Sequence, residues 1–190
     1  MQDLIKADLE ESISTKKEVL KTLVPKIEEA AKMMIAALKS GNKVMFCGNG
    51  GSAADSQHLA AELIGRFKKN RKALASIALT TDTSIITALG NDFGFDTIFA
   101  RQVEGLGKKG DVLVGISTSG GSKNLAEAFK KAKEIGIKTV SFLGCGGGML
   151  EKMVDLAITI PGSNTPRIQE AHITIGHIIC NLIEKEMFPQ

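Results

Sequence analysis

The stretch Val44-Met45-Phe46-Cys47-Gly48-Asn49-Gly50-Gly51-Ser52-Ala53-Ala54-Asp55 decides the fold of this chain. Its apolar beginning predicts a buried strand, and a glycine-rich turn then leads into a helix that begins at Ser52. Ser52 and Asp55 have the spacing of a capping box. A turn of this kind directs backbone N–H groups into a hollow at the positive end of the helix dipole, where anions bind.

This glycine loop, residues 48–51, is a weak indicator of function when it is taken alone, because glycine-rich turns are common. No Gly-Lys-Ser/Thr follows it, so it is not a P-loop. The third glycine of the pattern G-x-G-x-x-G is missing, so it is not a good dinucleotide fingerprint either.

A second loop of the same type follows an apolar run at 111–116 and precedes a predicted helix at 123–135. This hydroxyl loop is Ser117-Thr118-Ser119-Gly120-Gly121-Ser122. Hydroxyls and backbone amides can surround a phosphate, and each hydrogen bond to a charged group contributes about 1.5–3 kcal/mol. An ordinary turn with Ser122 as the N-cap would have a similar composition. Two such loops, each at the carboxyl end of a strand, favour a ligand site.

The rest of the chain alternates between apolar runs and helical patterns. The runs are continuous, which is typical of a parallel sheet that is covered on both faces. Predicted strands are 43–47, 75–79, 111–116, 138–143 and 155–160, and predicted helices are 53–66, 82–89, 96–105, 123–135, 148–153 and 166–187. We therefore expect one α/β domain over 1–190, with a doubly wound, flavodoxin-like, five-stranded parallel sheet in 41–190. In the common strand order 2-1-3-4-5, the two loops face each other at the topological switch point.

Residues 1–40 form a helical arm outside this sheet. Apolar and charged positions alternate with helical spacing, Pro25 predicts a break followed by a new helix, and Gly41-Asn42 ends it. An amphipathic arm of this kind predicts a surface that packs on a partner subunit, so we expect residues 1–40 to mediate oligomerisation.

Composition narrows the function classes. The net charge of +3 decides nothing about anionic partners, and we expect the basic cluster 68–72 to be a solvated loop. The chain has no Trp or Tyr for stacking on single-stranded nucleic acid, so a nucleic-acid partner is not expected. Cys47, Cys145 and Cys180 do not resemble a disulfide framework and predict free thiols in the cytoplasm. No signal peptide or membrane-length apolar run occurs, so no membrane partner is expected.

Two predicted helices carry residues suited to proton transfer or metal binding. His58 and Glu62 are four residues apart on one helix face, although spacing alone favours an ordinary surface pair. Gln169 and His177 lie on the final helix, two turns and about 80° apart, so both can reach one volume. His172 is offset from them, and we expect it to be structural.

Four motifs resemble those of the bacterial phosphoheptose isomerases, which belong to the sugar isomerase (SIS) domain family. They are Gly48-Asn49-Gly50-Gly51-Ser52, Gly90-Asn91-Asp92-Phe93-Gly94-Phe95, Gly115-Ile116-Ser117-Thr118-Ser119-Gly120 and Arg167-Ile168-Gln169-Glu170-Ala171-His172. The resemblance covers nearly the whole chain. It implies an SIS-domain fold, a homotetramer with active sites at subunit interfaces, and a cytoplasmic enzyme. The implied reaction converts sedoheptulose 7-phosphate to D-glycero-D-manno-heptose 7-phosphate, a precursor of lipopolysaccharide or other surface polysaccharide.

The resemblance also implies a role for individual residues. Glu62 and His177 would move protons. Substrate would be bound by Asn49, Gly50, Gly51, Ser52, Glu62, Asn91, Asp92 and Gln169, with Ser117, Thr118, Ser119 and Ser122 on the phosphate. One zinc ion per subunit would be bound by His58, Glu62, Gln169 and His177.

Three questions remain open at this level. A carboxylate bound to zinc is a poor base, so either zinc is structural or modulatory, or Glu62 leaves the metal when substrate binds. Non-catalytic SIS tetramers that bind the replication initiator share the fold and much of the glycine loop, and a sugar-phosphate sensor is a weaker alternative. The presence of both Glu62 and His177 favours the isomerase.

Overall fold

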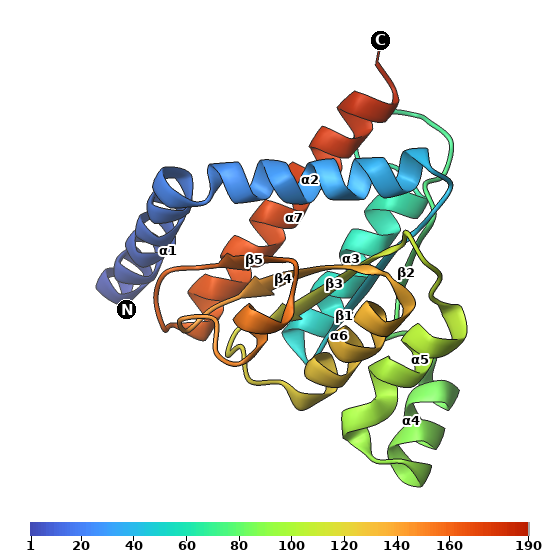
Figure 1. Cartoon of the computed structure of the whole chain (residues 1–190). Helices are drawn as coiled ribbons and strands as arrows, with labels where there is room; N and C mark the ends of the chain where they lie inside the picture. Colours follow the sequence, from blue (N-terminus) through green and yellow to red (C-terminus); the bar gives the residue numbers. More distant parts are fainter. Residues whose placement is uncertain (190) are drawn as a thin grey trace.

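A five-stranded parallel sheet forms the centre of the computed structural model, which describes residues 1–189 (Figure 1). Its strands are β1 (Val44–Gly48), β2 (Ser76–Ala78), β3 (Val112–Ser117), β4 (Lys138–Leu143) and β5 (Leu156–Thr159). They are arranged in the order β2-β1-β3-β4-β5, so the predicted fold class and strand order are confirmed. Gly48 at the end of β1 pairs with Ile116 near the end of β3, which places the two loops side by side.

Helices cover both faces of the sheet, as the continuous apolar strands predict (Figure 1). One face packs against α2 (Val24–Lys39), α3 (Gly51–Ile64) and α7 (Thr165–Met187). The other face packs against α5 (Ile98–Leu106) and α6 (Lys123–Ile135). The remaining helices are α1 (Gln2–Thr22), α4 (Thr83–Asp92) and the short 3₁₀ turns η1 (Phe95–Thr97) and η2 (Leu150–Met153).

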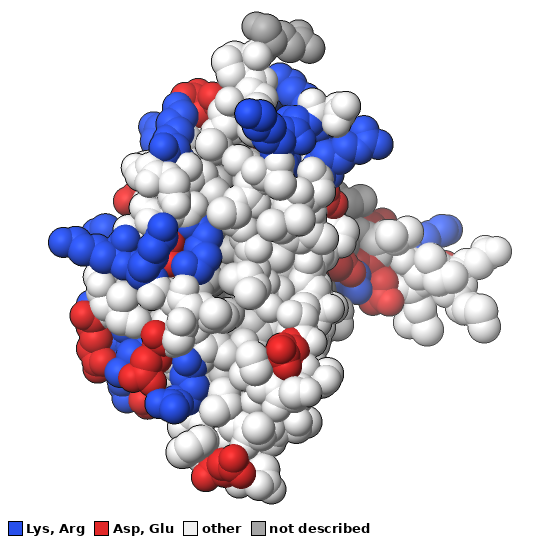
Figure 2. All heavy atoms as spheres, turned by 90° about the vertical axis from the view of Figure 1, so that its right-hand side faces the viewer, with Lys and Arg blue, Asp and Glu red and all other residues white. Residues whose placement is uncertain are grey.

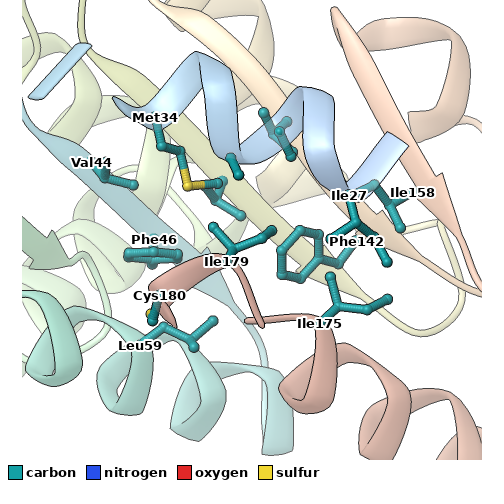
Figure 3. Packing of buried hydrophobic residues seen from close by; sticks show 14 of the residues in the cluster. Ile27, Met34, Val44, Phe46, Leu59, Phe142, Ile158, Ile175, Ile179 and Cys180 are labelled. Carbon is teal, nitrogen blue, oxygen red and sulfur yellow. The ribbon is translucent and has the colours of Figure 1, made fainter. Parts of the chain in front are cut away.

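The larger core fixes α3 and α7 relative to each other. Phe46 of β1 and Phe142 of β4 project from the sheet, and Leu59 of α3 and Ile179 of α7 pack on them (Figure 3). All four side chains are at most 2% exposed. Gly176 lies where the two helices approach most closely, because a Cβ there would be 2.5 Å from Leu59 Cδ2. The relative placement of side chains on α3 and α7 is therefore set by close packing.

The N-terminal arm has the predicted break. Helix α1 ends at Thr22, and α2 begins at Val24 with Pro25 in its first turn, where the missing N–H costs no hydrogen bond. Helix α2 belongs to the core, whereas Val19 is the one buried residue within α1. The apolar side chains Leu4, Leu9 and Ile13 are more than half exposed.

Several local predictions are wrong. Helix α3 begins at Gly51 rather than Ser52, and its N-cap is Gly50, with a φ of 55° and no side-chain capping bond. A Cβ on Gly48 would lie 2.7 Å from the Ser52 carbonyl oxygen, so the turn is too tight for a capping box. The helix predicted at 148–153 is the 3₁₀ turn η2. In the basic cluster, the Arg71 side chain is 2% exposed and paired with Glu184, so it is not solvated.

The three thiols are free, as predicted, with Cys47 and Cys180 buried and Cys145 exposed. Burial raises the pKa of Cys47 to about 12. Within residues 1–189, no helix combines the length and the apolar character that crossing a membrane requires.

Candidate functional site

The glycine loop and the hydroxyl loop meet at the carboxyl end of the sheet. Asn49 donates from Nδ2 to Asn124 Oδ1 at 3.0 Å, and Asn124 returns the same bond to Asn49 Oδ1 at 2.8 Å. Asn124 is the second residue of α6 and is buried, and the sequence analysis did not identify it. This closed amide pair ties the loops together and confirms that they share one crevice at the switch point.

The hydroxyl loop is shaped by its own serines. Ser117 Oγ lies 3.0 Å from Ser122 Oγ and accepts a hydrogen bond from the Gly120 amide at 3.2 Å. Ser119 Oγ accepts from the Gly121 amide at 3.2 Å. Ser122 is the N-cap of α6, as predicted for an ordinary turn, but its side chain makes no capping bond. The first N–H groups of α6 therefore carry no side-chain cap and suit an anion.

Glycine is required at the centre of this loop. Gly120 has a φ of 66°, and a Cβ there would overlap the carbonyl oxygen of Gly147. Thr118, the remaining member of the predicted phosphate group, is half-buried beside the exposed Ser119. The loop thus presents hydroxyls and amides on a backbone that has little freedom to move.

A second group of functional side chains lies between α3 and α7. His58 Nε2 is 2.9 Å from His177 Nε2 and 3.2 Å from Glu62 Oε1. His58 and Glu62 are one turn apart on α3, and His177 reaches them from α7, 119 residues away from His58 along the chain. The His58 side chain is 49% exposed, so solvent and small molecules reach this cluster.

The chemistry of this cluster fits a divalent metal. Its two imidazole nitrogens and one carboxylate oxygen all lie within 4.8 Å of one another. Tetrahedral zinc has nitrogen and oxygen ligands at about 2.0–2.2 Å, which puts neighbouring ligand atoms a little over 3 Å apart. The distances of 2.9 and 3.2 Å from His58 are close to that separation. His58, Glu62 and His177 can therefore serve as three ligands of one ion.

Gln169, the fourth predicted ligand, lies beside the glycine loop. A Cβ on Gly51 would be 2.5 Å from Gln169 Nε2, so glycine at this position leaves room for the amide. Gln169 also hydrogen-bonds the buried side chain of Asp55. Burial raises the pKa of Asp55, and the bond from Gln169 together with His58 and His177 acts in the opposite direction. Asp55, which the sequence analysis treated as a cap, is instead a neighbour of the cluster.

Other predicted site residues lie elsewhere in the chain. Gly50 is exposed at the rim of the crevice, whereas Ser52 is buried in the first turn of α3. Asn91 and Asp92 are exposed at the C-terminal end of α4, where Asn91 Nδ2 donates to Asp92 Oδ1 at 2.7 Å. Their side-chain bonds join them to each other and, within residues 1–189, to none of the other predicted site residues.

His172 is structural, as expected. It is fully buried, and its Nε2 lies 3.0 Å from the carbonyl oxygen of Leu143. Burial lowers its pKa from 6.5 to about 4, and the bond to Leu143 only partly opposes this. The imidazole is therefore neutral at neutral pH and fastens α7 to the end of β4.

The sequence analysis missed Phe67, whose ring centroid lies 5.6 Å from that of His177. Phe67 follows α3 and belongs to no motif, and a single aromatic residue in a basic segment gives no local signal. Its position beside the cluster depends on contacts with α7.

Comparison with known proteins places these features in context. A profile of the SIS domain matches residues 9–144. The phosphoheptose isomerase of Clostridium acetobutylicum is 53% identical, over 99% of this chain and 97% of that protein. The phosphoheptose isomerase of Nitratiruptor sp. is 55% identical, over 97% and 99%. The solved phosphoheptose isomerase of Neisseria gonorrhoeae superposes with a TM-score of 0.93 at 46% identity, covering 97% of this chain and 98% of that one.

Proposed function

Because this chain belongs to the SIS domain family and, within it, to the phosphoheptose isomerases, we propose that it converts sedoheptulose 7-phosphate to D-glycero-D-manno-heptose 7-phosphate. The observation that carries the proposal is the near full-length identity to phosphoheptose isomerases. Glu62 and His177, brought together by α3 and α7, supply the two proton-transfer groups that the reaction needs. We place the reaction in the cytoplasm, at the start of heptose supply for surface polysaccharide.

The reaction moves a proton between neighbouring carbons. A base removes a proton from C1 of the ketose, the bonding electrons form a 1,2-enediol, and a proton is then delivered to C2. Glu62 is suited to the first transfer, and His177 faces it from the other helix as the partner acid. A positioned acid or base contributes about 10²–10⁴ in rate. His58, at 3.2 Å from Glu62 Oε1, restricts where that carboxylate points.

The phosphate of the substrate belongs in the hydroxyl loop. Ser117, Thr118, Ser119 and Ser122 surround it there, at the N-terminus of α6. Helix α3 leads from the glycine loop to His58, and its rise of 1.5 Å per residue puts about 10 Å between them. An extended seven-carbon chain is long enough to span such a gap. Asn49, Gly50, Gly51 and Gln169, along this path, would line the sugar, with Asn91 and Asp92 added from α4.

The same cluster would hold one zinc ion per subunit. His58, Glu62 and His177 have the donor atoms and the spacing, and the amide of Gln169 is the fourth candidate ligand. Bound zinc would polarise the substrate carbonyl as a Lewis acid. Asp55 would act behind Gln169, because a carboxylate that accepts from the amide nitrogen leaves the amide oxygen free to bind the metal.

We further propose that the active enzyme is a homotetramer whose sites lie at subunit interfaces. Exposed apolar side chains on α1 and around α4 support this proposal, among them Leu4, Leu9, Phe93 and Phe95. A broad band without charged side chains crosses the face seen in Figure 2. Replacing Leu4 and Leu9 together by Glu should shift the sedimentation coefficient to smaller species, since both are well exposed in the single chain. An intact tetramer in this variant would exclude the outer face of α1 from the interface.

The test of the isomerase uses Glu62→Gln, which keeps the side-chain shape and removes the proton acceptor. Turnover should fall by at least about 10²-fold. Exchange of the C1 proton with deuterated solvent, followed by NMR, should stop as well. Glu127→Gln is the control, because Glu127 is an exposed residue that pairs with Lys130 on α6. Wild-type protein that neither turns over nor exchanges this proton would favour the non-catalytic alternative.

A further inference from the structure

The segment that follows α3, residues 65–72, is fastened to the C-terminal end of α7 by one carboxylate; we call it the strap (Figure 1). Glu184 Oε1 accepts hydrogen bonds from the amides of Lys68 at 2.8 Å and Lys69 at 2.7 Å. Glu184 Oε2 accepts from the amide of Phe67 at 3.1 Å and from Arg71 Nε at 3.2 Å. A single side chain thus orders most of the strap.

The Arg71 guanidinium carries this connection to the end of α3. Its Nη2 donates to the carbonyl oxygen of Glu62 at 2.8 Å, and its Nη1 donates to that of Leu63 at 2.7 Å. Because α3 ends at Ile64, both carbonyls belong to its last turn and lack partners within the helix. A positive charge at this end of a helix is also favourable. Arg71 therefore holds the backbone of Glu62 itself.

Glu184 and its bonds also reach His177. The two residues are seven positions apart on α7, about 20° short of two full turns, so they share one side of the helix. The Phe67 amide is bound to Glu184 while the Phe67 ring packs on His177 with centroids 5.6 Å apart. The strap thus connects both proton-transfer residues, one through its backbone and the other through its ring.

Both charged side chains are buried, Arg71 at 2% exposure and Glu184 at 3%. Burial disfavours the charged form of Glu184, but the amides of Lys69, Lys68 and Phe67 and the Arg71 side chain together lower its pKa. A buried ion pair is weak evidence for stability, because well-packed apolar residues often do as well. The partners of this pair, by contrast, are specific to the cluster between α3 and α7.

We propose that Glu184 and Arg71 are positioning residues, which act through the strap to hold Glu62 and His177 at the separation that proton transfer and metal binding require. The proposal rests on the isomerase function proposed above. It assigns no contact with substrate to either residue. It predicts effects on kcat and on metal affinity, with the binding of the sugar phosphate left nearly unchanged, because the hydroxyl loop lies on other elements.

The test compares Glu184→Gln with a matched control. Asp111 is a similar buried carboxylate that accepts from the amides of Lys43 and Lys108, both at 2.9 Å, and pairs with Lys43 Nζ. It precedes β3, at the edge of the sheet opposite the hydroxyl loop, so Asp111→Asn removes comparable bonds far from the cluster. Each variant is assayed below its own unfolding temperature, with folding checked by circular dichroism.

We expect Glu184→Gln to lower kcat and zinc affinity by about 10–100-fold, the usual effect of removing a residue that orients a ligand. The KM for sedoheptulose 7-phosphate should stay within about threefold, and Asp111→Asn should keep the wild-type kcat and zinc affinity. Wild-type values of both quantities in folded Glu184→Gln would overturn the proposal, as would equal losses in Asp111→Asn.

Two further arms keep the test decisive. If Glu184→Gln does not fold, Phe67→Leu retains the amide bond to Glu184 and removes only the ring beside His177; its kcat should still fall, and an unchanged kcat would overturn the proposal. Zinc affinity is measured by chelator competition and needs no turnover. If the wild-type protein lacks isomerase activity, the proposed function fails, while a loss of zinc affinity in Glu184→Gln alone would still support positioning by the strap.

Discussion

Acid should weaken the fold through His172, and replacing this residue by Gln should remove that sensitivity. His172 is fully buried against Phe142 and bonded to the carbonyl oxygen of Leu143, and its pKa is lowered from 6.5 to about 4. Below pH 6.5 the unfolded chain therefore binds a proton that the native state refuses. Stability from this residue is complete above pH 6.5 and is lost progressively as the pH falls toward 4.

The size of the effect follows from the pKa difference. Each pH unit within this window costs about 1.4 kcal/mol of unfolding free energy, so about 2 kcal/mol is lost near pH 5 and about 3 kcal/mol near pH 4. Gln can place its amide nitrogen near the position of the imidazole Nε2, so it can still donate to Leu143. The variant therefore loses the titration and retains the hydrogen bond.

The assay is urea unfolding at about pH 7.5 and about pH 5, at one protein concentration and with a chelator present. Carboxylates such as Glu184 also titrate in acid, and taking the difference between wild type and variant cancels their contribution. We expect wild type to lose about 2 kcal/mol more than His172→Gln between the two conditions. Equal losses in the two proteins would refute the assignment of a buried, neutral imidazole.

Two other predictions concern the site. Ser119→Ala should raise the KM for the sugar phosphate by about tenfold or more, since a hydrogen bond to a charged group is worth about 1.5–3 kcal/mol, and stability should change little because Ser119 is exposed; an unchanged KM would place the phosphate elsewhere. His58→Ala should lose bound zinc in elemental analysis, because it removes the ligand atom that lies close to both Glu62 and His177; full occupancy would exclude His58 as a ligand.

The sheet could be predicted because its determinants are local. Continuous apolar runs define each strand, and the turns after β1 and β3 contain the glycines that a tight exit requires. The order of the strands followed from the commonest doubly wound arrangement. Local rules failed where packing decides: Ser52 has the sequence of a cap, but the close approach of Gly48 to the first turn of α3 leaves that function to Gly50.

The site was predictable only in part, because its residues are far apart in sequence. The spacing of His58 and Glu62 identified a pair, and only the family resemblance joined His177 to it. Arg71 resembled a solvated charge, since its partner Glu184 is 113 residues away. No periodicity within the strap indicates that partner, and no motif marks Phe67. Contacts between distant segments require the fold before they can be recognised.

Helix α3 also limits how the gene for this protein can change. An inserted or deleted residue between Gly51 and Glu62 would turn everything beyond it by about 100° and shift it by about 1.5 Å, carrying His58 and Glu62 away from α7. Ala54, Gln57 and Ala61 are exposed on this helix and can vary freely in identity. The exposed turn at 161–164 has no such restriction on length. Over evolutionary time, α3 should therefore accumulate substitutions but conserve its length, whereas insertions and deletions should collect in turns such as this one.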